Sequence, residues 1–231
     1  MSTARQRITA FWDNQVAPWL NGDDPMPHPL PEWFASYAGK GRGEVTRDGF
    51  VEPYQGNLNG NPRMVSLGLN PGLYIPELQR RDGSFADEIR RAGAYSRWTA
   101  MQPYMGPTWL ANHKPNQYFT TRVTFGSAWF GEQLGAEGLL VFELFPWPST
   151  AVTGAMRPSP TIVNEFVGTR SANSKRSGSS RSARSGASSR LALNLPLVAA
   201  LGKGVEPYGS AVASRAIRVH TLPSGQLLLI H

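Results

Sequence analysis

The residues best suited to chemistry lie in two turns, each of which follows a short apolar run. The first turn is Gly68-Leu69-Asn70-Pro71-Gly72, at the end of an apolar run that begins at residue 64. Asn, Pro and Gly are typical of a strand that ends in a tight turn. An Asn side chain can orient a water molecule, but it cannot take up a proton at neutral pH. This turn therefore predicts a site that positions water without a general base.

The second turn begins with Glu143-Leu144-Phe145-Pro146, after an apolar run that starts at residue 139. Apolar residues at helical spacing predict a helix between the two runs, over residues 118–134. Two strands joined through a helix are expected to be parallel, and ligands bind beyond the carboxyl ends of such strands. We therefore expect Asn70 and Glu143 to converge on one pocket.

The two turns resemble two motifs of the uracil-DNA glycosylase superfamily. In that family one strand ends in a G-x-[DN]-P-[GY] turn that lines the base pocket. A later strand carries N-x-x-P, whose Asn reads the edge of a flipped-out base. The first motif is matched by residues 68–72, in a form most similar to the mismatch-specific and single-strand-selective branches. The resemblance covers residues 45–167 and, more weakly, residues 191–231.

The resemblance implies a role for each residue of the first turn. Asn70 would hold the attacking water, and Leu69 with neighbouring backbone N–H groups would contact the base carbonyls. Gly68 and Pro71 would line the base pocket. Gly72 stands where the strictly uracil-specific branch has a tyrosine that excludes a 5-methyl group, so a bulkier base could enter here.

Two further positions match the family more loosely. Phe85 lies near the family position of the aromatic that stacks on the base, and Tyr74 and Trp147 are alternatives nearer the turns. The family's H-P-S-P motif follows the last strand and supplies a His for the leaving base and a wedge for the DNA stack. His231 follows the apolar run 227–230, so we interpret it as the first residue of that motif, with the rest absent. The similar residues 157–160 follow the wrong strand and lack the His.

Glu143 departs from the family pattern, because it replaces the Asn of N-x-x-P. An ionised Glu only accepts hydrogen bonds, so it would repel the two carbonyls of uracil. A carboxylate suits an exocyclic amine instead, as on cytosine or adenine. The alternative is that Glu143 is turned aside into an ion pair or a helix cap.

Composition limits the class of protein. The 231 residues fit one domain, 1–231, and the absence of cysteine excludes disulfides, thiol catalysis and Cys-ligated metal. No metal and no other cofactor is expected. No segment reaches the roughly 20 apolar residues that span a bilayer, so we expect a cytoplasmic monomer with no membrane partner.

The formal charge of +7 is concentrated in residues 168–190. This segment holds five Arg, one Lys, no acid and no large apolar residue, and removing those six bases leaves 17 basic against 16 acidic residues. Such a segment cannot bury enough surface to offset its ordering entropy, so it is predicted to be a disordered insertion. A flexible linker, a nucleic-acid-binding tail and an out-of-frame segment all remain open as its origin.

The predicted elements favour an α/β fold. A helix distorted near its end by Pro18, the strand 64–69, the helix 118–134, the strand 139–145, a helix over 161–167 and a strand pair over 216–222 and 226–230 are expected. We expect a three-layer sandwich with a short central parallel sheet of about four strands. The family would place its fourth strand between residues 167 and 191, where this chain carries the insertion.

The first functional hypothesis is a DNA glycosylase, a hydrolase of base-excision repair that flips out a damaged or modified base. Its partner would be DNA, single-stranded or carrying such a base, because an unpaired base costs less to extrude. The alternative is a catalytically weak or inactive nucleic-acid-binding relative. A small-molecule nucleotide-binding protein is a third possibility, although the sequence has neither a P-loop nor a dinucleotide fingerprint.

Overall fold

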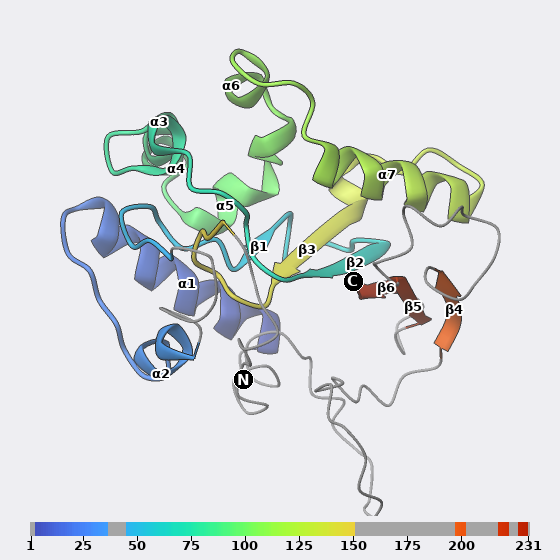
Figure 1. Ribbon diagram of the computed structural model, residues 1–231, viewed down its shortest axis with the longest axis horizontal. Coiled ribbons are helices and arrows are strands. Elements are labelled where there is room, and N and C mark those ends of the chain that lie inside the picture. The colour runs from blue at the N-terminus through green and yellow to red at the C-terminus, as the bar shows by residue number, and fades with distance from the viewer. Residues whose placement is uncertain (1–2, 37–44, 151–196, 202–216, 222–225, 231) are drawn as a thin grey trace, which may run out of the picture.

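The computed structural model describes residues 3–36, 45–150, 197–201, 217–221 and 226–230, and Figure 1 shows their helices above the sheet and at its β1 end. The helices are α1 Ala4–Leu20, α2 Leu30–Ala35, α3 Pro76–Gln79, α4 Ser84–Ala92, α5 Tyr95–Ala100, α6 Pro107–Leu110 and α7 Gln117–Phe130, with 3-10 turns η1 Pro103–Met105 and η2 Ala136–Gly138. The strands are β1 Tyr54–Gln55, β2 Met64–Gly68, β3 Leu139–Glu143, β4 Leu197–Leu201, β5 Ile217–Thr221 and β6 Leu227–Ile230. The predicted helix 161–167, the predicted disordered segment 168–190 and His231 lie outside the described residues.

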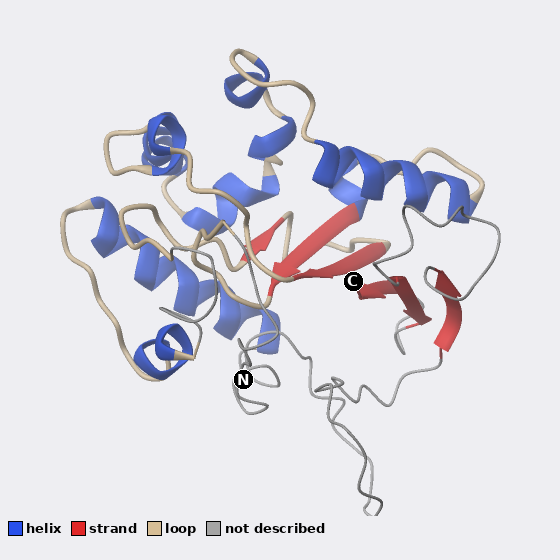
Figure 2. Ribbon diagram, viewed as in Figure 1, coloured by secondary structure: helices blue, strands red, loops and turns tan. Residues whose placement is uncertain are grey.

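The six strands form one mixed sheet in the order β1-β3-β2-β6-β5-β4 (Figure 2). β2 pairs in parallel with β3 and with β6, whereas the pairs β1–β3, β5–β6 and β4–β5 are antiparallel. The α/β class and the C-terminal strand pair are confirmed. The expectation of a parallel sheet of about four strands is wrong, because only the central three strands are parallel. The connection between β5 and β6 has too few residues for a parallel crossover, which needs a dozen or more.

The two faces of the central strands pack against different helices. On one face Arg122 of α7 donates from Nε to Ser66 Oγ of β2 at 2.9 Å. Side chains alternate between faces along a strand, and on the other face Phe142 of β3 packs against Tyr54, with ring centroids 6.0 Å apart. Tyr95 of α5 donates its hydroxyl to the Tyr54 carbonyl at 2.6 Å. α7 therefore packs on one face of the central strands and α5 on the other.

Helix α1 is capped at its N-terminus by a side chain next to it, whereas a carbonyl in its last turn is bound by an arginine from another part of the chain. At its start Gln6 N–H donates to Thr3 Oγ1 at 3.2 Å and Thr3 N–H donates to Gln6 Oε1 at 2.8 Å, which is a capping box. Its last turn contains no basic residue. Instead Arg81 donates from Nε to the Trp19 carbonyl at 2.9 Å, and its guanidinium lies 5.1 Å from the centroid of the Trp19 ring. Pro18 lies inside the last turn of this helix, which continues to Leu20, and the predicted distortion stays a prediction.

The core of the described residues is dominated by aromatic side chains. The largest fully buried ones are Trp12, Trp33, Trp98, Trp147, Tyr54, Tyr95, Phe50, Phe85 and Phe145. Many pack edge to face, as Phe50 and Trp98 do with centroids 5.3 Å apart and an interplanar angle of 88°. Trp33 of α2 also donates Nε1–H to the Leu144 carbonyl at 3.0 Å. This bond ties the core to the turn that follows β3.

Candidate functional site

β2 and β3 end next to each other, and the turns that follow them remain side by side. Gly68 is the register partner of Glu143 in the last parallel pair. Beyond that pair, Leu144 N–H donates to the Gly68 carbonyl at 3.1 Å, and Phe145 N–H donates to the Leu69 carbonyl at 2.9 Å. The two turns therefore meet at the carboxyl ends of neighbouring parallel strands, as expected, whereas a pocket shared by Asn70 and Glu143 stays a prediction.

Asn70 is held in this junction by Ser149 of the second turn. Asn70 Nδ2 donates to the Ser149 carbonyl at 2.8 Å and to Ser149 Oγ at 3.0 Å. Because a carbonyl oxygen can only accept, the amide nitrogen of Asn70 must be the atom that faces Ser149. The amide oxygen Oδ1 is therefore directed away from Ser149, and within the described part of the chain it has no hydrogen-bond partner. An acceptor in this position can orient a water molecule.

The surface of the first turn is open. Leu69 is 45% exposed and Pro71 is half-buried. Gly72 has φ +95°, a value that side-chain-bearing residues rarely adopt, and a Cβ placed on it would meet no atom of the described residues within 4 Å. Its carbonyl accepts from Ser149 N–H at 2.8 Å. The space beside Gly72 is therefore free, while its backbone is fixed by the second turn.

Glu143 points toward α7 and is buried there. Its side chain is only 4% exposed, and Tyr118 of α7 donates its hydroxyl to Oε1 at 2.9 Å. Oε2 has no hydrogen-bond partner among the described residues. The sequence left open a base contact or a side chain turned aside into an ion pair or a cap. The structure shows Glu143 turned aside, but onto a tyrosine hydroxyl.

The surroundings of Glu143 decide its charge. Burial raises the pKa of Glu143 to about 8, and the buried carboxyl of Glu52 acts in the same direction. The hydrogen bond from Tyr118 and the positive charge of Arg122 lower the pKa but do not outweigh burial. Arg122 lies over the Tyr118 ring, with its guanidinium carbon 3.4 Å from the ring centroid. Burial therefore favours the neutral form of Glu143, whereas the sequence argument took it as an ionised, acceptor-only group.

A second buried carboxyl, Glu52, was not identified from the sequence. It is 1% exposed and lies just before β1. Tyr104 donates its hydroxyl to the carboxylate, 2.9 Å from Oε1 and 2.8 Å from Oε2, Gln55 Nε2 donates to Oε2 at 3.0 Å, and Gln79 Nε2 donates to Oε1. Burial raises the pKa of Glu52 to about 7, against the lowering effect of these three donors. Buried carboxyls with perturbed pKa values are concentrated at functional sites, so Glu52 and Glu143 are both candidate functional groups.

The aromatic residues suggested as stacking platforms are mostly interior. Phe85 is completely buried, with its ring centroid 5.2 Å from that of Trp98 and 5.1 Å from that of Tyr104. Trp147 is buried as well, whereas Tyr74 is half-buried. In this arrangement Phe85 presents no open face to a base.

The strand that leads to His231 does reach the site. β6 pairs in parallel with β2, and its last residue, Ile230, is the register partner of Leu67. This pair lies one position before Gly68, at the same edge of the sheet. His231 itself is outside the described residues, so its proposed role rests on the sequence.

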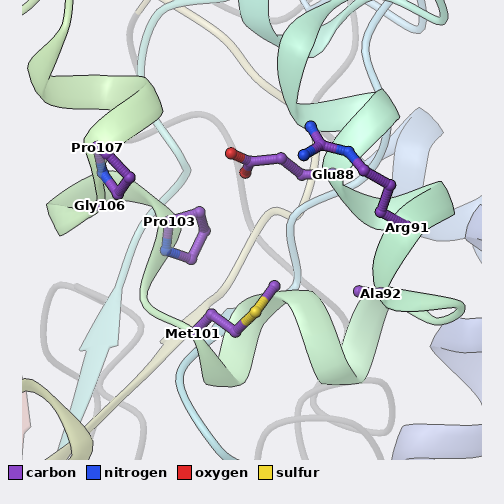
Figure 3. A pocket seen from close by; sticks show the side chains of 7 residues that line it. All are labelled: Glu88, Arg91, Ala92, Met101, Pro103, Gly106 and Pro107. Atoms are coloured by element: carbon purple, nitrogen blue, oxygen red, sulfur yellow. The ribbon is translucent and has the colours of Figure 1, made fainter.

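A cavity of about 370 Å³ lies away from the strand ends, between α4, the end of α5, η1 and α6 (Figure 3). It is lined by Glu88, Arg91, Ala92, Met101, Pro103, Gly106 and Pro107. The Glu88 carboxylate already accepts from Trp98 Nε1 at 2.9 Å and from the Thr108 hydroxyl. These bonds give Glu88 a structural role that links three helices, and none of the residues predicted for the site lines this cavity.

The fold and the site define an α/β protein with a polar site at the carboxyl ends of parallel strands. Comparison of the chain with family models, with curated proteins and with solved structures gives no match. In the described ranges, no group of three or more His, Asp or Glu residues could hold a metal ion. No helix in those ranges has the length and apolar character needed to cross a bilayer.

Proposed function

We propose that this protein is a DNA glycosylase-like hydrolase, which holds a flipped-out damaged or modified base at the turns after β2 and β3. The observation that carries the proposal is the position of Asn70. It lies at the carboxyl edge of the parallel strands, with its nitrogen bound by Ser149 and its oxygen Oδ1 without a partner among the described residues. This is the edge at which α/β sheets bind ligands. The proposal includes the three-layer arrangement expected from the family.

In the proposed reaction, water attacks the sugar carbon C1′ while the bond between C1′ and the base nitrogen breaks. The bonding electron pair leaves with the base, and the attacking water loses one proton to solvent. Asn70 Oδ1 accepts a hydrogen bond from the water and so fixes the direction of its lone pair. Because no general base takes part, we expect slow turnover.

Two observations support a substrate base that differs from uracil in its size or in the charge that it requires from the site. The space beside Gly72 is open, so a substituent on the ring can be accommodated. Burial favours the neutral form of Glu143, so the end of β3 need not place a full negative charge close to the first turn.

The test is an excision assay with defined oligonucleotides. Single- and double-stranded DNA carrying uracil, hypoxanthine or a modified cytosine is incubated with the protein, and abasic sites are cleaved with alkali. We expect cleavage that Asn70→Ala reduces at least about 100-fold, within the range that positioning contributes to catalysis. Asn59→Ala is the matched control, because Asn59 is exposed and bonds to Thr9 away from both turns. Binding of DNA without cleavage of any base would favour the inactive nucleic-acid-binding relative instead.

A further inference from the structure

We infer that Ser149 is a positioning residue, which fixes the amide of Asn70 so that Oδ1 is the atom presented to the reacting water. This inference rests on the proposed function, and it assigns to the second turn a part in catalysis that sequence motifs do not give it. Its basis is the pair of acceptors, carbonyl and hydroxyl, that Ser149 presents to one Asn70 nitrogen.

Ser149 is buried, and backbone contacts on both of its sides fix its position. The residue is 1% exposed, and it forms an antiparallel bridge with Val45. The preceding residue, Pro148, accepts from Thr46 N–H at 3.3 Å through its carbonyl. On its other side Ser149 N–H donates to the Gly72 carbonyl at 2.8 Å. The second turn is thus anchored on both sides, and the first turn is fixed relative to it.

The Ser149 carbonyl imposes one orientation on the Asn70 amide, and the Ser149 hydroxyl adds a second acceptor in that orientation. In the observed orientation the NH₂ group donates to the carbonyl and to the hydroxyl of Ser149. A flip of the amide would place Oδ1 against the Ser149 carbonyl, where two acceptors would repel each other. The flipped state would also present NH₂ instead of oxygen to the water, with the opposite hydrogen-bonding sense. Ser149 therefore determines which atom of Asn70 faces the substrate.

A double-mutant cycle separates this role from ordinary structural support. Ser149→Ala keeps the carbonyl acceptor and removes the hydroxyl, so we expect kcat for the best substrate base to fall about 3- to 10-fold, with KM unchanged. In the Asn70→Ala background the same substitution should have no further effect on kcat, because the group that it positions is gone. Ser127→Ala is the control, since Ser127 donates to the Val123 carbonyl and accepts from Leu134 N–H, remote from the turns.

A second measurement does not depend on activity. The side-chain amide signals of Asn70 are assigned by ¹H–¹⁵N NMR from their loss in Asn70→Ala, and they are then compared among the full-length variants. We expect Ser149→Ala to shift and broaden them and Ser127→Ala to leave them in place. Unchanged Asn70 signals in a folded Ser149→Ala protein, or equal kcat losses with and without Asn70, would overturn the inference.

The two measurements also distinguish this inference from the proposed function. If Ser149→Ala shifts the Asn70 amide signals but the unchanged protein excises no base, the proposed function and the catalytic part of the inference are overturned. The Ser149–Asn70 contact is then still established. Excision that depends on Asn70 but not on Ser149 would keep the proposed function and overturn the inference alone.

Discussion

Gly68 and Glu143 are register partners at the ends of β2 and β3, and Glu143 Oε2 occupies the space that a side chain at position 68 would need. The Tyr118 hydroxyl lies against the same point. Glycine is therefore required here by the close approach of a buried carboxyl and a phenol. The first turn therefore packs directly against the buried Glu143–Tyr118 pair.

The first prediction concerns this contact. Gly68→Ala should destabilise the protein by about 1–3 kcal/mol, because the added methyl group overpacks Glu143 and Tyr118 in the interior. The free energy of unfolding is measured by urea denaturation followed by circular dichroism. Gly72→Ala is the comparison, since its cost comes from φ +95° in open space and not from a clash. If Gly68→Ala lowers the free energy of unfolding by the same amount in a Tyr118→Phe, Glu143→Ala background, the explanation is contradicted.

The second prediction is that stability falls as pH rises from about 4.5 to about 8. Burial raises the pKa of Glu52 from 4.5 to about 7 and that of Glu143 from 4.5 to about 8. Between the unfolded and the folded values the folded state binds more protons than the unfolded state. The stability from these groups is fully present below the unfolded pKa and is lost as pH rises through the folded pKa, at up to about 1.4 kcal/mol per pH unit for each group.

Urea denaturation at half-unit steps from pH 4.5 to 9 measures this dependence. Glu143→Gln keeps the shape and the acceptor for Tyr118 but removes one titration, so its stability should decline less steeply above pH 7. Glu32→Gln is the control, because Glu32 is exposed and its pKa is lowered, which places its titration below this window. A slope in Glu143→Gln equal to that of the unchanged protein would rule out Glu143 as a contributor.

The central strands and the main helices follow from local patterns. β2, β3 and α7 are apolar runs or helical repeats bounded by Gly, Pro and Asn, and the structure places their ends within a few residues of the predictions. The predicted helix 118–134 ends early because Gly131 adopts φ +69° and terminates α7. The mixed character of the sheet was missed, since strand direction depends on connections and on the partners of β1 and β4, which no local pattern specifies.

The candidate site was predictable only where its parts are local in sequence. The turn around Asn70 was recognised because its residues are contiguous, whereas Ser149 lies 79 positions from Asn70. The Glu52 cluster combines Tyr104, 52 positions away, with Gln79, 27 positions away. A lone acid between Val51 and Pro53 gives no indication of such partners. The charge of Glu143 likewise depends on burial under α7, which only the tertiary structure shows.

The third prediction concerns the hydrogen bond from Arg81 to the last turn of α1. Arg81→Ala should cost about 1–2 kcal/mol, because it removes a charged hydrogen bond to the Trp19 carbonyl and a cation–π contact with the same residue. Arg81→Lys should recover only part of this, since an ammonium cannot reproduce the planar fork that reaches both Trp19 and the Asp23 carbonyl at 3.0 Å. Thermal unfolding measures both variants. Arg91→Ala, whose exposed Nε bonds within its own helix, should change the midpoint little.

The last prediction links the base preference to the ionisation of Glu143. We expect uracil excision to be slow or absent at neutral pH and greater on single strands than on duplex, because an unpaired base needs less unstacking energy. As pH rises through about 8, Glu143 becomes anionic against Gly68 of the first turn, and its charge disfavours the negative charge that develops on the leaving base, so excision should fall about tenfold. Glu143→Asn removes this charge and should raise uracil excision relative to other bases, most strongly at pH 9. The assay is single-turnover excision on single-stranded uracil DNA from pH 6 to 9, at a temperature where circular dichroism shows both proteins folded, with Glu137→Gln as an exposed-carboxylate control. Rapid uracil removal from duplex DNA by the unchanged protein, with no decline toward pH 9, would show that Glu143 does not influence the leaving base.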